Sequence, residues 1–315
     1  MKITVLDAAT LGNDISFEKW EELGELTVYN TTSAEEVINR LLGSDVAILN
    51  KVKITAEVIA ALPTLKLICV TATGYDNIDL SACKEKEVAV CNVKGYSTHS
   101  VAQVTLTLVL ALMTHLSEYQ GCVKSGDYTK SGIQNRLTPV FHELYGKTFG
   151  IIGLGNIGKQ VARVAEAFGC KVLCYKRTPD PDFNCVDLET LLRQSDIVTL
   201  HLPLSDETKN IIGKKELGLM KKSAILVNAA RGAITDETAV AKAIKNGIIG
   251  GFATDVYSVE PLEKDSPLQK IKNLNNVILT PHMAWGAYES RVRCIEEIAE
   301  NISSFINGEQ RNRVI

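Results

Sequence analysis

The sequence predicts an α/β protein with two domains, each built on a parallel sheet. Short apolar runs that suit strands alternate with stretches whose apolar residues recur at helical spacing. This alternation begins at the N-terminus, is interrupted by a long helix, and restarts near residue 99. Alternating strands and helices form a parallel sheet that helices cover on both faces. A chain of 315 residues is also too long for one ordinary core.

The first half of the chain contains four predicted strands and three predicted helices. The helical stretches are SAEEVINRLL, TAEVIAAL and LSACKEKE, and a capping Ser or Thr opens two of them. A long helix from about residue 97 to about residue 117 follows, and we expect it to end before the Gly-containing segment 121–132. The predicted strands are ITVLD (3–7), VAILN (46–50), LICV (67–70) and VAVC (88–91).

The second half opens with TFGIIGLGNIGKQVARVAEAFGCKVLCY, which predicts a strand, a Gly-rich turn, an amphipathic helix and another strand. DETAVAKAIKNG predicts a helix that a glycine ends. The last helix, AYESRVRCIEEIAENISSFING, has no strand after it. It could pack on the first domain, which would make that domain discontinuous in sequence. The remaining predicted strands are DIVTLHL, AILVNAA, GGFATDV and NVILTPH.

Composition and charge are typical of a soluble globular protein. The chain is 45% hydrophobic and 23% charged, and its formal charge of −3 exerts no general attraction on nucleic acid or anionic membranes. The eight cysteines include no CxxC pair and no zinc-ligand spacing, so we expect buried thiols in a reducing compartment and no metal site. MKITVLDAAT is not a signal peptide, and no apolar run approaches the roughly 20 residues of a membrane span. A cytoplasmic protein is predicted.

The segment GIIGLGNIG has the glycine spacing of a phosphate-binding loop. It follows an apolar strand and opens a helix, and this context makes the motif far more specific than glycine spacing alone. Gly153 permits a tight turn, Gly155 lets the backbone approach a pyrophosphate, and Gly158 lets helix and strand pack closely. Free N–H groups at the helix start, which include those of Asn156 and Ile157, would bind the phosphates. The alternative is a purely structural glycine turn.

A basic pair stands where such units usually place an acid. Lys176 lies 23 residues after Gly153 (176 − 153), close to the expected position of the acid that binds two ribose hydroxyls. No acid occupies positions 176–178. Lys176 and Arg177 instead suit a 2′-phosphate, with Thr178 adding a hydroxyl. We therefore expect NADP(H) to be preferred and NAD(H) to be accepted; the alternative is a solvated basic turn.

Three polar residues emerge from predicted strands after the Gly-rich loop. Arg231 follows AILVNAA, Glu260 follows GGFATDVYSV, and His282 follows NVILTP. Ligands of open α/β sheets bind at the carboxyl ends of the strands. An arginine there can hold a carboxylate in a bidentate grip, and a histidine beside a carboxylate can transfer a proton near neutral pH. The three residues are therefore predicted to be catalytic.

The chain resembles the D-isomer-specific 2-hydroxyacid dehydrogenases over essentially its whole length. The resemblance implies two flavodoxin-like or Rossmann-like domains, with a dinucleotide-binding domain (99–284) inserted into a substrate domain (1–98 plus 285–315). The motifs that carry it are, in order, ATGYDNIDL, NVKGYSTHSVAQ, GIIGLGNIG, SDIVTLHLPLSDET, LVNAARG, FATDVYSVEP and TPHMAW.

The resemblance also implies roles for individual residues. Arg231 would bind the carboxylate and the carbonyl of the substrate, His282 would be the acid/base, and Glu260 its partner. Asp255 would bind the carboxamide of the nicotinamide.

Further substrate contacts are expected from both parts of the chain. The resemblance implies that the backbone at Thr73 and Gly74 binds the substrate carboxylate. Asn50 and Lys51, at the end of an early strand, are candidates to contact the distal group of the substrate. Trp285 is a further candidate, and packing at the domain junction is its alternative role.

PHMAW and GYST look most similar to the glycerate dehydrogenase and hydroxypyruvate/glyoxylate reductase branch. The resemblance thus implies reduction of a small 2-keto acid to the D-2-hydroxy acid, and a homodimer joined through residues of about 98–145. Alternatives are D-lactate dehydrogenase and a dinucleotide-sensing co-repressor of the same fold. Formate dehydrogenase is disfavoured because that branch has Gln in place of Glu260.

Overall fold

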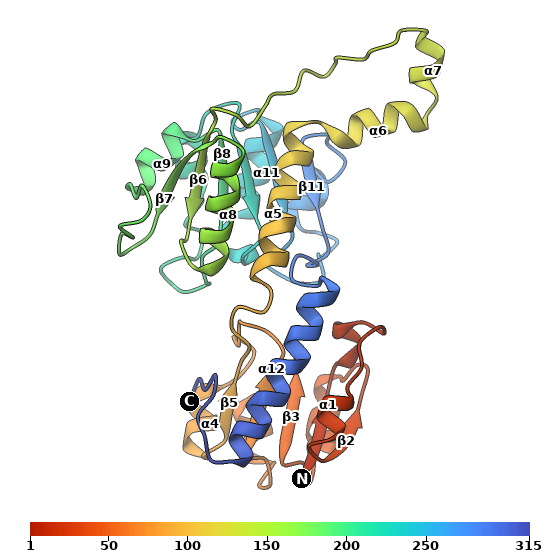
Figure 1. Ribbon diagram of the computed structural model, residues 1–315, viewed down its shortest axis with the longest axis vertical. Coiled ribbons are helices and arrows are strands. Elements are labelled where there is room, and N and C mark those ends of the chain that lie inside the picture. The colour runs from red at the N-terminus through yellow and green to blue at the C-terminus, as the bar shows by residue number, and fades with distance from the viewer. The chain divides into compact units, whose positions relative to one another are not determined.

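The computed structural model describes residues 1–315, which form two compact units (Figure 1). Unit 1 comprises residues 1–97 and 286–315, and unit 2 comprises residues 98–285. Unit 1 contains a five-stranded sheet and unit 2 a six-stranded sheet, and all strand pairs are parallel. The predicted α/β class with two parallel sheets is therefore confirmed.

The sheet of unit 1 has the strand order β2-β1-β3-β4-β5. This is the order of flavodoxin-like sheets. Its central strands β3 and β4 are buried along their whole length, as expected for strands that helices cover on both faces. The strands are β1 (Lys2–Val5), β2 (Glu25–Val28), β3 (Val46–Leu49), β4 (Leu67–Val70) and β5 (Ala89–Cys91).

Strand β2 was not among the predicted strands, and that omission was wrong. It pairs with β1 from Lys2↔Glu25 to Val5↔Val28 and forms the edge of the sheet. Its side chains are largely exposed, without the alternation of buried and exposed positions on which strand prediction depends. Backbone pairing with β1, rather than side-chain burial, places this strand.

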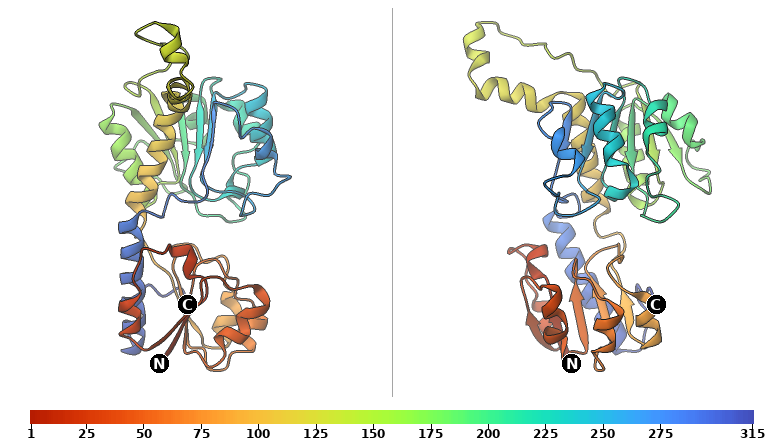
Figure 2. Two further views of the ribbon diagram at one scale, coloured as in Figure 1. Left: turned by 90° about the vertical axis from the view of Figure 1, so that its right-hand side faces the viewer. Right: turned by 180° about the vertical axis from the view of Figure 1, so that it is seen from behind.

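The last helix, α12 (Tyr288–Ile306), belongs to unit 1 and lies along one face of its sheet (Figure 2). The indole Nε1 of Trp20, a fully buried side chain, donates to the carbonyl oxygen of Ile295 at 3.0 Å. Ser290 donates to the carbonyl oxygen of Tyr96 at 3.1 Å. The C-terminal helix thus packs on the sheet that the N-terminal residues form. The other helices of unit 1 are α1 (Glu18–Glu21), α2 (Val37–Leu41), α3 (Ala56–Ala60) and α4 (Leu80–Glu85).

The sheet of unit 2 has the strand order β11-β10-β9-β8-β6-β7. Cys185 adds an isolated parallel bridge to Cys174 on the outer side of β7. If this bridge is counted as a strand, the order becomes the 3-2-1-4-5-6 order of dinucleotide-binding sheets, followed by β11. The strands are β6 (Thr148–Ile152), β7 (Lys171–Tyr175), β8 (Ile197–Leu200), β9 (Ile225–Asn228), β10 (Gly251–Thr254) and β11 (Val277–Leu279).

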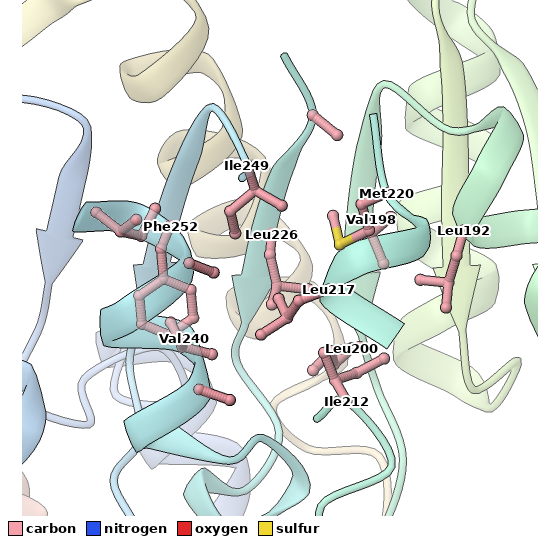
Figure 3. Close-up of a cluster of buried hydrophobic side chains, with 14 of the residues drawn as sticks. Leu192, Val198, Leu200, Ile212, Leu217, Met220, Leu226, Val240, Ile249 and Phe252 are labelled. Atoms are coloured by element: carbon pink, nitrogen blue, oxygen red, sulfur yellow. The ribbon is translucent and has the colours of Figure 1, made fainter. Parts of the chain in front are cut away.

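Unit 2 has a hydrophobic core on each face of its sheet, because successive strand residues point to opposite faces. Ile151 packs in the core with α5 and α8, and Ile152 packs in the core with α9, α10 and α11. Figure 3 shows side chains of the second core, including Leu192, Leu217, Leu226, Val240 and Phe252. The helices are α5 (Thr98–Met113), α8 (Asn156–Ala167), α9 (Leu188–Gln194), α10 (Lys214–Leu219) and α11 (Glu237–Lys245).

The predicted long helix to about residue 117 is instead broken. Helix α5 ends at Met113, and His115 adopts a left-handed backbone conformation with φ of 49°. The chain then forms α6 (Leu116–Lys124) and α7 (Asp127–Ser131), so Gly121 lies within a helix rather than in a loop. In Figures 1 and 2, α6 and α7 extend away from the sheet of unit 2. No single helix has the length and apolar character needed to span a bilayer; only the pair α5 and α6, bent by 65°, has them jointly.

Candidate active site

The Gly-rich loop joins β6 to helix α8. Gly153 has φ of +98°, and a Cβ there would lie 2.7 Å from the backbone of His201. A Cβ on Gly158 would overlap the carbonyl of Gly153. A Cβ on Gly155, by contrast, would have no atom within 4 Å. Two glycines are therefore required by packing, while the third leaves open space beside the unpaired N–H groups at the start of α8. The open space and the N–H groups suit the pyrophosphate of a dinucleotide, and the binding role of this loop stays a prediction.

His201 lies directly behind this loop. Its backbone N–H donates to the carbonyl oxygen of Ile152 at 2.8 Å, and its Nε2 is 3.0 Å from the hydroxyl of Thr199. Part of the residue reaches the surface, but its Nδ1 is buried and has no hydrogen-bond partner. Burial lowers the pKa of His201 from 6.5 to about 4, so the ring is neutral near pH 7. His201 is not among the site residues predicted from the sequence; the available signal was its position directly after a strand.

The basic pair expected at the ribose lies on a loop after β7. Hydrogen bonds of 2.9 Å join Cys174 to Asn184 and to Val186 and close the base of this loop. Arg177 forms an ion pair of 2.9 Å with Glu207, and both side chains are well exposed, at 85% and 75%. The Nζ of Lys176 lies 3.9 Å from a carboxylate oxygen of Asp180. Thr178 is exposed. The assigned role of these three residues in binding a 2′-phosphate remains a prediction.

Sequence reasoning missed three charged residues that pair with each other or with the basic pair, namely Lys159, Asp180 and Glu207. Lys159 immediately follows the third glycine of the loop, and its Nζ forms an ion pair of 2.7 Å with Asp180 Oδ2. The pKa of Asp180 is lowered, first by the hydrogen bond from Lys159, with smaller effects from the Asp182 backbone N–H and from Lys176. The available signal was an acid four residues after Lys176, in PDPD, just beyond positions 176–178 where an acid was expected.

Arg231 follows β9 on a turn that a buried asparagine fixes. Asn228 donates from its side chain to the carbonyl oxygen of Arg231 at 2.9 Å and accepts from the N–H of Ala230 at 3.1 Å. One guanidinium nitrogen of Arg231 donates to the carbonyl oxygen of Ala230 at 2.9 Å. A Cβ on Gly232 would overlap the backbone of Tyr257, so glycine allows the turn after β9 to pack against the turn after β10.

Glu260 and His282 form a direct pair. A carboxylate oxygen of Glu260 lies 2.6 Å from Nδ1 of His282, while its other oxygen accepts from the backbone N–H of Tyr257 at 3.1 Å. Because a carboxylate only accepts, Nδ1 carries the hydrogen, and Nε2 is left to exchange a proton. The hydroxyl of Tyr257 donates to the carbonyl oxygen of Thr280 at 2.8 Å, which links the turns that carry the pair. Burial and neighbouring carboxylates raise the pKa of Tyr257 to about 12, so it remains a donor.

Asp255 is almost fully buried and holds the loop that precedes and follows His282. Its carboxylate accepts from the hydroxyl of Thr280 at 2.6 Å, from the N–H of Met283 at 2.9 Å and from the N–H of Ala284 at 2.8 Å. These contacts give Asp255 a structural role; its expected contact with the carboxamide stays a prediction. Trp285, the last residue of unit 2, is partly buried, and its expected contact with the substrate stays a prediction.

The substrate contacts expected in unit 1 lie at the carboxyl ends of β3 and β4. Asp7 accepts from the backbone N–H of Asn50 at 2.8 Å and from that of Lys51 at 2.6 Å, which fixes the turn after β3. Asn50 is buried, and its side-chain Nδ2 has no hydrogen-bond partner. The backbone N–H groups of Thr73 and Gly74, after β4, donate to no group of the protein. Both turns thus retain unused donors.

The chain is similar to the members of one protein family. Residues 106–284 match the family model for the NAD-binding domain of D-isomer specific 2-hydroxyacid dehydrogenases. A glycerate dehydrogenase of Methylorubrum extorquens is 39% identical over 314 residues, covering 99% of this chain and 98% of that protein. The chain belongs to the D-isomer specific 2-hydroxyacid dehydrogenases. As a member of this family it is an oxidoreductase that uses a nicotinamide cofactor.

Other members of the family extend the comparison. A glyoxylate reductase of Thermococcus litoralis is 39% identical over 264 residues, covering 82% of this chain and 78% of that protein. An acyclic imino acid reductase solved with NADPH and D-Arg has a TM-score of 0.87 at 33% identity, with 100% of both chains covered. A D-lactate dehydrogenase of Aquifex aeolicus, solved with NAD and lactic acid, has a TM-score of 0.86 at 31% identity and covers 98% of this chain and 96% of that one.

Proposed function

We propose that the protein reduces a small 2-keto acid to the D-2-hydroxy acid, with hydroxypyruvate or glyoxylate as the favoured substrate. The observation that carries the proposal is the 2.6 Å contact between Glu260 and His282, which follow two adjacent strands. Arg231 follows the next strand of the same sheet. Reduction of a keto acid requires a positioned proton donor and a cation, because negative charge develops on the carbonyl oxygen.

The bound nicotinamide would supply the hydride, and the residues of this chain would do the rest. His282 donates a proton from Nε2 to the developing alkoxide, while Glu260 holds the other ring nitrogen and stabilises the charged ring. The planar guanidinium of Arg231 can bind the substrate carboxylate through paired N–H donors and polarise the substrate carbonyl. The donors of Thr73 and Gly74 provide a second site for the carboxylate.

The substrate preference rests on the relatives and on Asn50. Curated relatives are named glycerate dehydrogenase, hydroxypyruvate reductase and glyoxylate reductase. The buried amide nitrogen of Asn50 can donate to a polar distal group such as the hydroxyl of hydroxypyruvate. A bulky apolar group in its place would leave this nitrogen without a hydrogen-bond partner. D-lactate dehydrogenase activity is the second candidate, because a solved relative with that name covers nearly the whole chain.

A turnover assay with NADPH and a panel of keto acids tests the proposal. We expect the highest kcat/KM with hydroxypyruvate or glyoxylate, lower values with pyruvate, and the lowest with phenylpyruvate. Pyruvate as the best substrate would support the D-lactate dehydrogenase candidate instead. Phenylpyruvate as the best substrate would contradict the branch assignment, and absence of turnover with every keto acid would contradict the reductase. Oxidation of formate with NAD or NADP, measured in parallel, should be undetectable.

We also propose that NADP(H) is preferred over NAD(H). An acid at position 176 would repel a 2′-phosphate, whereas Lys176 and Arg177 can bind one through charge-assisted hydrogen bonds of roughly 1.5–3 kcal/mol each. Exposure and the existing ion pairs weaken this gain, so a preference rather than exclusion is expected. In the variant Lys176→Asp/Arg177→Ala, the ratio of kcat/KM for NADPH to that for NADH should fall by about tenfold or more. A native enzyme that favours NADH would contradict the proposal.

We also propose that the protein is cytoplasmic and forms a homodimer. The segment from α6 to the start of β6 exposes many large apolar side chains, which is unusual for a surface that stays in water. A second copy of this chain is the proposed partner. Sedimentation should give a dimer that Leu137→Glu/Val140→Glu converts to monomer, and a native monomer at micromolar concentration would contradict it. The exposed apolar residues include Leu116, Val123, Ile133, Leu137, Val140 and Tyr145.

A further inference from the structure

The loop proposed to bind the ribose contains an acid that is shared between two lysines. Asp180 Oδ2 lies 2.7 Å from Lys159 Nζ and 3.9 Å from Lys176 Nζ, and its side chain is only 9% exposed. Its other oxygen accepts from the backbone N–H of Asp182 at 3.3 Å. The carboxylate is therefore held in place by the loop, and it connects that loop to the first turn of α8.

The charges of this cluster are partly balanced within the protein. Three cations, Lys159, Lys176 and Arg177, face two anions, Asp180 and Glu207. One net positive charge remains for a phosphate that carries about −1.5 to −2 at pH 7. Because Arg177 and Glu207 are well exposed, solvent screens their pair. Asp180 is mostly buried and lies close to both lysines. It therefore lowers the electrostatic potential at this loop more than Glu207 does.

The two lysines differ in how firmly Asp180 holds them. At 2.7 Å, Lys159 makes a charge-assisted hydrogen bond. At 3.9 Å, the Nζ of Lys176 is attracted by the carboxylate of Asp180 but makes no hydrogen bond with it. Lys176 can therefore turn toward a ligand at a small cost in free energy. Lys176 is thus the cation available to a 2′-phosphate, while Lys159 is withheld. Repulsion between Asp180 and the phosphate opposes the gain.

We propose that Asp180 sets the cofactor preference of this enzyme by withholding Lys159 and lowering the positive potential around Lys176. Asp180 thereby limits the discrimination in favour of a 2′-phosphate. The proposal rests on the proposed binding of NADP(H) at this loop.

Calorimetric binding of 2′,5′-ADP and 5′-AMP tests the proposal without turnover, because these nucleotides differ only in the 2′-phosphate. The readout is the ratio of the Kd for 5′-AMP to the Kd for 2′,5′-ADP. For Asp180→Asn, which keeps the shape and the acceptor for Asp182, this ratio should rise roughly three- to tenfold at 0.15 M salt. The kcat/KM ratio for NADPH over NADH should rise in parallel.

Asp182→Asn is the matched control, because it removes the same charge from the same loop and Asp182 is exposed. Its Kd ratio should stay within about twofold of the native value. Lys159→Gln provides a test in the opposite direction: the full charge of Asp180 would then act on Lys176, and the ratio should fall. An unchanged or lowered ratio in Asp180→Asn, or an equal rise in Asp182→Asn, would overturn the proposal. A Kd ratio near one in the native protein would contradict the proposed NADP(H) preference. It would leave the role of Asp180 to be decided by the change of that ratio between the native protein and the variants.

Discussion

Two regions of the sheet in unit 2 place charged side chains in different ways. At the ends of β9 and β11, the turns that carry Arg231 and His282 are fixed by the buried side chains of Asn228 and Asp255. The turn that carries Glu260, after β10, is tied to them through Tyr257. After β7, at the opposite edge of the sheet, Lys176 and Arg177 lie on a loop whose contacts are ion pairs close to solvent. Buried hydrogen bonds fix the geometry of the first region, whereas the balance of charges determines the electrostatic potential of the second.

This difference separates two functions that one site must combine. Buried, fully paired polar groups cost stability when one partner is lost, so they keep a geometry constant. Exposed ion pairs contribute little to stability and can change partners. We therefore expect substitutions at the ends of β9 to β11 to affect turnover or folding, and substitutions after β7 to affect the choice of cofactor.

The largest effect should come from the proposed proton donor. His282→Ala removes the group that protonates the alkoxide, and kcat for keto-acid reduction should fall by about 10²–10⁴. Binding of 2′,5′-ADP, measured by calorimetry, should be retained because the ribose loop is separate. Near-native turnover on every keto acid that the native enzyme reduces would show that His282 is not the donor.

Gly232→Ala should disturb the contact between two turns of the catalytic region. The new Cβ would overlap the backbone of Tyr257, so the free energy of unfolding should fall by about 1–3 kcal/mol and kcat/KM should fall with it. Gly218→Ala, in α10, is the control because its Cβ would have no atom within 4 Å. Denaturant unfolding of both variants provides the measurement. Equal stabilities would mean that the close packing at Gly232 is not needed.

His201, behind the Gly-rich loop, predicts how stability depends on pH. Its pKa is lowered from 6.5 to about 4, so between these values the unfolded chain binds a proton that the folded protein does not. This contribution is present above pH 6.5 and is lost as the pH falls to about 4, by up to about 3 kcal/mol. Unfolding of His201→Asn should therefore depend less on pH in that window, whereas the exposed His142→Asn should follow the native profile. Parallel native and His201→Asn profiles would contradict this account.

Glu260→Gln should produce the smallest change. The amide can still accept from Nδ1 of His282, but the charge that stabilises the protonated ring is lost. The pH optimum for reduction should therefore move downward by about one unit. Glu263→Gln, an exposed acid on the same turn, should leave the profile unchanged. An unshifted optimum in Glu260→Gln would argue against the pairing.

The regions also differ in how far the sequence predicts them. Buried strands and the glycines of GIIGLGNIG follow from apolar runs and backbone sterics, which are local properties. The edge strand β2 and the break at His115 do not, because they depend on pairing with β1 and on a left-handed residue that no local pattern marks. Likewise, the pairing of Lys159 with Asp180 joins a helix to a loop, and spacing from the glycines could not indicate it.

The separation of turnover from cofactor choice is tested most directly by comparing two variants with both cofactors. We would measure kcat and kcat/KM for NADPH and NADH in His282→Ala and in Lys176→Asp/Arg177→Ala. His282→Ala should lower kcat with both cofactors by the same factor, about 10²–10⁴, and leave the NADPH/NADH ratio of kcat/KM within about twofold of native. The loop variant should change that ratio about tenfold or more through the KM for the cofactor, with a far smaller loss of kcat. A changed ratio in His282→Ala, or a comparable loss of kcat in the loop variant, would contradict the account.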